Sequence, residues 1–358
     1  MNAHTDDVPG RPRVSIVVLN YNGHRHLPLW ESFFTEKFAD KEIVFVDNGS
    51  TDGSDEEFRR LAAKNPGTKV RIHKIPENVG YSQGCIEGAR QARGEILVLL
   101  NNDIEISPHF VEPLVTELTA DSRLQLVQAN LYSLYKRNRP DEVWNRLDVF
   151  GYAHLQQPLG DSLTEVFYVE GAAFAFRREL LLDVGYLYPP EYFMLFEDVD
   201  LSWRTRLRGF RCAVVRGAIA WHARGGTEEG GVTKLNPRLL QCATRNRLAT
   251  LFTNYGSLRM IIFVPLSASL SLGRALLLWH RRERTYARSV FQGVVSFLRD
   301  LGFLRERRRH VQLSRRVSDR EALSLLMGPT EALHELVGLW ARASEERFRL
   351  PVTPPKPG

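Results

Sequence analysis

Amide and carboxylate side chains follow an apolar segment at Asn101-Asn102-Asp103, directly after residues 96–100. The Asp103 carboxylate at the end of such a segment is a suitable ligand for Mg²⁺ or Mn²⁺. A cation bound there would stabilise the negative charge of a departing phosphate group. Taken alone, the three residues are also an ordinary turn sequence.

Two acids, Glu197-Asp198, follow another apolar segment, residues 192–196. We therefore expect them at the wall of a cleft rather than on a solvated face. There Asp198 could accept the proton of an attacking hydroxyl group. The alternative is that these acids only complement the dipole of a helix N-terminus. Asp200 and Arg204 have the spacing of a structural i,i+4 ion pair.

A polar loop and a single histidine are further candidates. Asp47 and Asp52 lie in the loop 47–54, where a carboxylate could accept hydrogen bonds from a base or a ribose. The same loop is also a normal turn and helix start. His222 stands before the glycine-rich residues 225–231 and is a candidate metal ligand, although a single histidine is more often structural.

Short β-branched segments separated by helix-like segments indicate the sheet that must position these side chains. The expected strands cover residues 14–19, 43–46, 70–75 and 96–100. One expected helix begins at Ser54, where Glu57 would complete a capping box, and another covers residues 82–93. This alternation predicts an α/β fold with a mainly parallel central sheet. Ligands of such sheets bind beyond the carboxyl ends of the strands, so we predict a ligand site among the polar loops there.

The second half of the chain has a less regular pattern. Residues 121–161 fit no clear element, and residues 166–176 indicate a strand interrupted at Gly171. A helix over 198–208 and a strand over 212–215 are expected next. The sequence also lacks GxxxxGK[ST] and, after the first strand, GxGxxG. A metal ion on a strand-end carboxylate is therefore the expected way to bind phosphate.

Four motifs occur in the order and spacing typical of one known family. They are residues 14–23 (VSIVVLNYNG), 47–54 (DNGSTDGS), 99–103 (LLNND) and 196–204 (FEDVDLSWR). Through them residues 13–247 resemble family 2 glycosyltransferases, most closely the bacterial rhamnosyltransferase-like branch. The resemblance implies a GT-A fold and an inverting transfer of a sugar, such as rhamnose, from a nucleotide-sugar donor.

The resemblance also implies roles for individual residues. The nucleotide-binding residues would be Asn20, Tyr21, Asn22, Asp47, Asn48, Asn78, Gly80 and Asn102. Asp103 would be the second acid of the family's DxD motif and would bind Mg²⁺ or Mn²⁺ with His222, and Asp198 would be the catalytic base. Three departures are Asn101 in place of the first acid of DxD, Ile86 in place of a common asparagine, and residues 186–190 in place of GFDE.

The family resemblance sets an expectation for the substrates. The expected donor is dTDP-rhamnose, with a UDP-sugar as the alternative. The expected acceptor is a hydroxyl group of a lipid-linked saccharide in cell-envelope polysaccharide synthesis. A non-catalytic nucleotide-binding scaffold protein at a membrane is the alternative function, because Asn101 removes one acid from the metal motif.

Positive charge is concentrated in one C-terminal segment. The formal net charge is +6, and residues 274–316 hold 12 Arg against three acids. The overlapping residues 260–279 are apolar apart from Arg274 and several serines. An arginine at the centre of a spanning helix costs roughly 2.5–3.5 kcal/mol, so we expect an interfacial helix on an anionic membrane surface, with a single span as the alternative. Nucleic acid is not an expected partner, because no groove-reading module accompanies the arginines.

These patterns predict three regions of the chain. They are a catalytic domain over residues 13–240, a basic helical membrane-associated region over 241–325, and a C-terminal helix and tail over 326–358. Residues 1–13 are polar and do not resemble a secretory signal. The cysteines form no CxxC pair, which fits a reducing compartment. We therefore expect a peripheral protein at the cytoplasmic face of the cell membrane.

Overall fold

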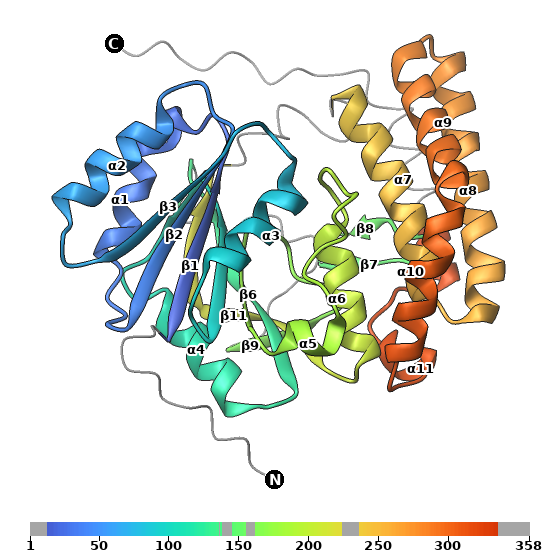
Figure 1. The fold of residues 1–358 in the computed structure, drawn as a ribbon. Helices are drawn as coiled ribbons and strands as arrows, with labels where there is room; N and C mark the ends of the chain where they lie inside the picture. The colour runs from blue at the N-terminus through green and yellow to red at the C-terminus, as the bar shows by residue number, and fades with distance from the viewer. Residues whose placement is uncertain (1–12, 136, 138–144, 155–161, 224–235, 336–358) are drawn as a thin grey trace.

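The computed structural model describes residues 13–135, 137, 145–154, 162–223 and 236–335. The glycine-rich residues 225–231, most of the N-terminal segment 1–13 and residues 336–358 of the predicted tail lie outside this description. A nine-stranded sheet forms the centre of the fold, and a group of long helices lies along one side of it (Figure 1).

The first four strands form the parallel half of the sheet. They are β1 (Val14–Asn20), β2 (Lys41–Asn48), β3 (Lys69–Ile75) and β4 (Ile96–Asn101), in the spatial order β3-β2-β1-β4. All seven residues of β1 are buried, as expected of a strand covered on both faces. The register pairs Asn20 with Asp47 at the ends of β1 and β2. The polar loops that follow these strands therefore meet at one edge of the sheet.

Helices cover both faces of this half. On one face, α1 (Leu27–Thr35) and α2 (Ser54–Lys64) pack Trp30 and Phe58 around Phe45 of β2. On the other face, α3 (Tyr81–Gln91) packs Cys85 and Ala89 against the sheet. The apolar contacts on the two faces fix the strands and hence the positions of the loops at their ends.

The predicted capping box at Ser54 is wrong. Helix α2 begins at Ser54, and its N-cap is Gly53, with φ +78°. The Ser54 hydroxyl accepts a hydrogen bond from the Asn20 side chain at 2.8 Å, and the Ser54 amide donates to Asp52. A tertiary hydrogen bond to β1 thus replaces the local cap that the sequence suggested.

The second half of the sheet is mixed rather than parallel. Strand β10 (Ala173–Arg177) lies between β4 and β6 (Leu124–Ser133) and is antiparallel to both. The strand predicted over 166–176 forms only as β10, after the interruption predicted at Gly171; the preceding strand, β9 (Leu163–Val166), begins earlier in the chain and pairs with β11. Parallel pairing, which the sequence predicted for most of the sheet, occurs among β1–β4 and between β6 and β11.

The long strand β11 (Arg211–His222) extends well beyond the predicted residues 212–215. An irregularity between Val215 and Ile219 divides it, and its last residues pair with β5 (Ile104–Ile106). Helix α4 (Val111–Ala120) covers this part of the sheet, and α5 (Leu180–Val184) and α6 (Glu197–Leu207) precede β11 in the chain. The pairing of β11 with β5 brings His222 to the end of β4.

The C-terminal part is helical, with α7 (Pro237–Asn254), α8 (Ser257–His280), α9 (Arg284–Arg299), α10 (Leu301–Ser314) and the short α11 (Asp319–Ala322). Helix α7 packs on α6, and α8 and α9 form the outermost layer (Figure 1). A small hairpin, β7 (Arg146–Leu147) and β8 (Ala153–His154), lies between the sheet and these helices. The predicted boundary at residue 240 falls inside α7 and stays a prediction.

Candidate active site

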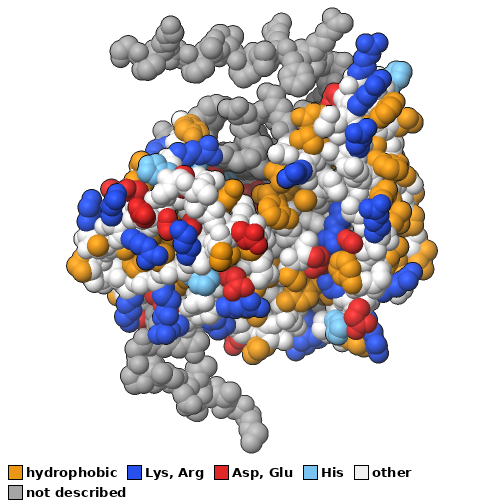
Figure 2. Space-filling model, turned by 45° about the horizontal axis from the view of Figure 1, so that its top comes forward, with side chains coloured by type: hydrophobic (Ala, Val, Ile, Leu, Met, Phe, Trp, Pro, Cys, Tyr) orange, Lys and Arg blue, Asp and Glu red, His pale blue; other side chains and the backbone are white. Residues whose placement is uncertain are grey.

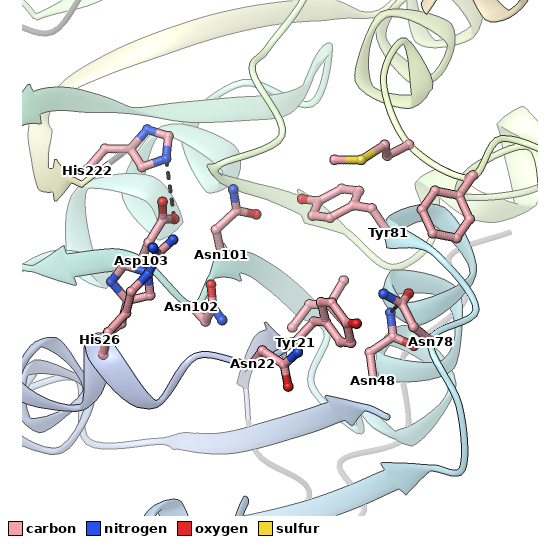
Figure 3. Close-up of a pocket in the computed structure, with 14 residues that line it drawn as sticks. Tyr21, Asn22, His26, Asn48, Asn78, Tyr81, Asn101, Asn102, Asp103 and His222 are labelled. Atoms are coloured by element: carbon pink, nitrogen blue, oxygen red, sulfur yellow. Dashed lines mark hydrogen bonds and ion pairs between the residues drawn. The ribbon is translucent and has the colours of Figure 1, made fainter. Parts of the chain in front are cut away.

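A pocket of about 300 Å³ opens at the carboxyl ends of β1, β2 and β4 (Figure 3). Its lining consists of Leu19, Tyr21, Asn22, Arg25, His26, Asn48, Asn78, Tyr81, Asn101, Asn102, Asp103, Phe193, Met194 and His222. The polar loops predicted from the strand ends thus meet around one cavity, as the fold rule requires.

One end of the pocket carries the predicted metal ligands. His222 Nε2 lies 3.3 Å from Asp103 Oδ1, and both side chains are largely buried (Figure 3). The pairing of His222 with Ile104 places the histidine beside Asp103, although the two residues are far apart in the chain. Among the described residues no group of three His, Cys, Asp or Glu side chains could hold a metal ion. A cation here would therefore need further oxygen ligands from a bound molecule.

Asn101, in the place of the first acid of DxD, also lines the pocket. Its side-chain Oδ1 is buried and has no hydrogen-bond partner in the described part of the chain. An unsatisfied buried polar atom is costly and therefore indicates a missing partner. Asp103 and His222 are suitable ligands for a cation, and the unpaired Asn101 oxygen lies in the lining of the same pocket.

Arg25 and His26 line the same end of the pocket and were not predicted from the sequence. Arg25 Nε donates a hydrogen bond to His26 Nε2 at 3.0 Å. Burial lowers the pKa of His26, and the nearby Asp103 carboxylate opposes that shift. The sequence feature that could have indicated them is the run of three basic residues at positions 24–26, directly after the loop that follows the first strand.

The other end of the pocket is lined by amides. Asn48 Nδ2 donates to Asn78 Oδ1 at 3.1 Å and to the carbonyl of Gly80, and Asn48 Oδ1 accepts from the amide of Val79. Tyr21, 48% exposed, stands at the mouth. Neutral donors and acceptors beside an aromatic ring are suited to a nucleoside.

Asn20, Asp47 and Gly80 were predicted to bind the nucleotide, but none of these three residues lines the pocket. Asn20 is fully buried: it donates to Asp47 at 3.1 Å and to Ser54, and it accepts from Asn102 Nδ2 at 2.8 Å. These residues therefore lie behind the lining and fix the loops that form it.

Asp198 is not one of the residues that line the pocket, but it is only partly buried. Its Oδ2 accepts a hydrogen bond from the amide of Gly171 at 3.0 Å, and the carbonyl of Gly171 accepts one from the hydroxyl of Tyr81 at 2.7 Å. Burial raises the pKa of Asp198 to about 6, although hydrogen bonds from the amides of Val199 and Gly171 oppose the shift. Burial, and then the adjacent Asp198 carboxylate, raise the pKa of Glu197 well above its ordinary value. Such neighbouring acids with perturbed pKa values are typical of catalytic sites.

The predicted ion pair of Asp200 and Arg204 is confirmed. Arg204 Nε lies 2.7 Å from Asp200 Oδ2, and both side chains are almost fully buried. The other Arg204 nitrogens donate to the carbonyls of Val184, Tyr186 and Leu187. This pair therefore holds the segment before α6 and has a structural role.

The mixed sheet with its strand-end pocket, the Asp103–His222 pair and the amide-lined end defines a protein of the GT-A glycosyltransferase type. The sequence model of the Glycosyltransferase like family 2 matches residues 12–246. The chain belongs to this family, and the predicted family and fold are thereby confirmed.

Several characterised proteins are similar to this chain. Poly-beta-1,6-N-acetyl-D-glucosamine synthase of Staphylococcus aureus (strain COL) is 24% identical over 231 residues, which cover 64% of this chain and 53% of that protein. The chain thus spans about half the length of this curated relative. TarS 1–349 from S. aureus, solved with UDP-GlcNAc, has a TM-score of 0.55 at 15% identity and covers 84% of this chain and 91% of its own. Mannosyltransferase PcManGT from Pyrobaculum calidifontis, solved with GDP-Man and Mn²⁺, has a TM-score of 0.53 at 18% identity, with coverages of 81% and 88%. These structural likenesses support the fold.

Proposed function

We propose that this pocket transfers a sugar from a nucleotide-sugar donor to a hydroxyl group, with inversion at the anomeric carbon. The observation that carries the proposal is the Asp103–His222 pair at the end of a pocket whose other end is lined by the amides of Asn48 and Asn78. The nucleoside would lie against these amides and the diphosphate beside Asp103 and His222. A Mg²⁺ or Mn²⁺ ion on that pair would neutralise charge on the leaving diphosphate.

Asp198 is the proposed catalytic base. The acceptor oxygen forms a bond to the anomeric carbon while the bond from that carbon to the diphosphate oxygen breaks, and the hydroxyl proton passes to the Asp198 carboxylate. A pKa of about 6 leaves this group ionised at neutral pH and more basic than an ordinary aspartate. Because the two oxygens lie on opposite faces of the sugar, the configuration inverts.

The donor sugar is proposed from two lines of support. The motifs resemble those of rhamnosyltransferases and favour dTDP-rhamnose. The similar structures were solved with UDP-GlcNAc and with GDP-Man and favour other donors. The nucleotide end of the pocket is built from amides, which can pair with any of these bases, so the donor must be tested directly.

A nucleotide-sugar panel tests the proposed function. Purified protein is incubated with dTDP-rhamnose, UDP-GlcNAc and GDP-mannose, with Mn²⁺, with Mg²⁺ and with a chelator, and thermal shift and release of nucleoside diphosphate are measured. We expect one donor to raise the unfolding temperature and to be hydrolysed slowly only when a metal is present. If a nucleotide sugar binds but is not hydrolysed with either metal, the nucleotide-binding scaffold is favoured. If no nucleotide sugar binds or reacts under any condition, both functions are wrong.

The proposed acceptor is a lipid-linked saccharide, reached from the cytoplasmic face of a membrane. Helix α8 is long and apolar enough to cross a bilayer by length and composition, yet only 28% of its most apolar window is buried. Its large exposed side chains are Leu258, Ile261, Ile262, Leu266, Leu272, Leu276 and Trp279. Figure 2 shows hydrophobic side chains along this edge and basic ones gathered at its upper end. An apolar face with a basic end is typical of helices that lie in the interface of an anionic membrane.

A further inference from the structure

The turn that leads into α6 has an unusual backbone conformation. Leu195 and Phe196 both have φ +72°, and within the described residues they are the only two consecutive non-glycine residues with positive φ. Side chains with a Cβ disfavour this left-handed region, because Cβ approaches the following carbonyl oxygen. Such strain persists only where surrounding contacts over-determine the conformation.

The first half of the turn is held by residues at the start of α3. The amide of Tyr81 donates a hydrogen bond to the carbonyl of Phe193 at 2.6 Å. Gly80, with φ +89°, lies so close that a Cβ there would come within 2.5 Å of the same carbonyl oxygen. Phe193 and its neighbour Met194 line the pocket. The turn is therefore part of the pocket wall as well as the start of α6.

The second half of the turn is fixed from α7. Asn246 Nδ2 donates to the carbonyl of Met194 at 3.1 Å and to that of Leu195 at 2.8 Å. Asn246 is only 2% exposed. The side-chain amide of Asn246 thus binds two successive carbonyls, one directly before Leu195 and one directly before Phe196.

The orientation of the Asn246 amide is itself determined. Arg245 Nη1 donates to Asn246 Oδ1 at 3.0 Å, which identifies the oxygen and leaves the nitrogen facing the turn. Arg245 is in turn held by Asp300, at 2.8 Å from Nε, at the junction of α9 and α10. Tyr192, just before the turn, donates to the carbonyl of Asn246 at 3.1 Å. The C-terminal helices therefore hold the turn through one buried asparagine.

We propose that Asn246 is a positioning residue for the sugar transfer proposed above, acting by holding the strained turn so that Asp198 keeps its place beside Gly171. Asp198 is the second residue of α6, and the amide of Asp200 donates to the carbonyl of Phe196 at 3.0 Å. A relaxation of the turn would therefore shift the first turn of the helix and with it the hydrogen bond between Asp198 and Gly171. The inference rests on the proposed role of Asp198 as the base.

The test compares two buried residues of α7. Asn246→Ala removes both hydrogen bonds to the turn, and Asn246→Ser is the milder variant if the first does not fold. Thr253→Val is the matched control, because Thr253 is fully buried on the same helix and donates only to carbonyls of that helix. The measurements are thermal unfolding, hydrogen exchange of the amides of residues 193–200, donor affinity, and kcat with the donor that the panel identifies.

We expect Asn246→Ala to lower kcat by about 10- to 100-fold, since small displacements of a catalytic group have effects of this size, while the donor Kd changes little. Hydrogen exchange should become faster at residues 193–200 and stay unchanged in β1–β4. The acid limb of the kcat profile should also move to lower pH, because a displaced Asp198 is better hydrated. Thr253→Val should leave kcat and the profile unchanged.

A second substitution tests whether relaxation of the strained turn causes the loss of kcat in Asn246→Ala. Leu195→Asn in the Asn246→Ala background should recover most of the lost kcat, because asparagine adopts the left-handed conformation more readily than leucine. Wild-type exchange and wild-type kcat in Asn246→Ala would overturn the inference, as would an equal loss of kcat in Thr253→Val. If the wild-type protein turns over no donor, the proposed function fails, and the exchange experiment alone still decides whether Asn246 holds the turn.

Discussion

The pocket and its surroundings have two halves that are held in place in different ways. The nucleotide half carries the proposed nucleotide and metal ligands, and the other half leads to Asp198. The nucleotide half is built by β1–β4, whose parallel register brings Asn48, Asn102 and Asp103 to one edge. The half that carries Asp198 depends instead on a strained turn, the Asp200–Arg204 pair and a side chain from α7. Backbone pairing thus positions the residues proposed to bind the donor, while side-chain contacts from a separate part of the chain position the proposed catalytic base. Substitutions should therefore affect binding in the first half and turnover in the second.

The largest effect is expected in the second half. Asp198→Asn should keep the fold and donor binding and lower kcat by roughly 10²–10⁴-fold, because the proton of the acceptor hydroxyl loses its acceptor. Steady-state kinetics and donor titration check this. Turnover close to wild type would remove Asp198 from the proposed role.

For Asp103→Asn, in contrast to Asp198→Asn, we expect the main loss in donor binding rather than in kcat. Loss of this carboxylate should weaken metal-dependent donor binding by on the order of 10²-fold, an effect at the upper end of those reported for residues around metal sites. Asn101→Asp should strengthen metal binding, because it restores the first acid of DxD. Titrations of Mn²⁺ at fixed donor concentration measure both, and a donor affinity that is equal with and without metal would contradict the role of Asp103.

The pH dependence distinguishes the halves without any substitution. With the pKa of Asp198 at about 6, kcat should fall about tenfold per pH unit below that value, while donor affinity changes less. The raised pKa also means that the folded protein binds this proton more tightly than the unfolded chain. Ionisation of Asp198 therefore costs stability as the pH rises from about 4 to above 6. Asp198→Asn should accordingly raise the unfolding temperature at neutral pH and change it less near pH 4.

A smaller effect on the nucleotide half is expected from Arg25→Gln. Arg25 lines the same pocket as Asp103 and His222, and a hydrogen bond to a charged group contributes about 1.5–3 kcal/mol. Nucleoside diphosphate affinity should therefore fall at least about tenfold, and nucleoside affinity should not. Arg60→Gln, at an exposed position on α2, is the control. Equal affinities in calorimetry for wild type and Arg25→Gln would contradict a contact with the diphosphate.

The smallest effect on chemistry is expected at α8. Leu276 is 71% exposed, so Leu276→Asp should leave the fold and the hydrolysis of free donor unchanged. Cosedimentation with anionic liposomes should fall several-fold, because a buried leucine contributes roughly 1.5–3 kcal/mol. The same sedimentation as wild type would indicate that this face does not meet the membrane.

The sequence predicted the nucleotide half well, because its signals are local. Apolar runs such as residues 14–19 and the polar residues after them define both the strands and the edge where ligands bind. His222 was predicted as a metal ligand from its position before the glycine-rich residues and from the family resemblance, whereas its pairing with Ile104 of β5, which places it beside Asp103, was not predicted. Arg25 and His26 were missed because a short 3₁₀ turn, His24–His26, brings both into the pocket lining, with His26 close to Asp103.

The second half could not be predicted to the same extent, because its elements are defined by distant partners. In residues 163–177, β9 pairs with β11, and β10 pairs with β4 and β6, so the ends of both strands depend on partners that lie far away in the chain. The capping box predicted at Ser54 does not form, and the Ser54 hydroxyl instead accepts a hydrogen bond from Asn20, which lies 34 residues away in the chain. The strain at Leu195 and Phe196 has no signature in composition, since neither residue favours a left-handed backbone.

The buried amide of Asn20 has a consequence for engineering donor preference. Its nitrogen holds Asp47, Ser50 and Ser54 in the loop after β2, and its oxygen holds Asn102, the neighbour of Asp103. The loop proposed to recognise the nucleobase and the loop that carries the proposed cation ligand thus share one side chain. A redesign of base specificity that disturbs Asn20 should alter metal affinity at the same time, so the two properties would have to be selected together.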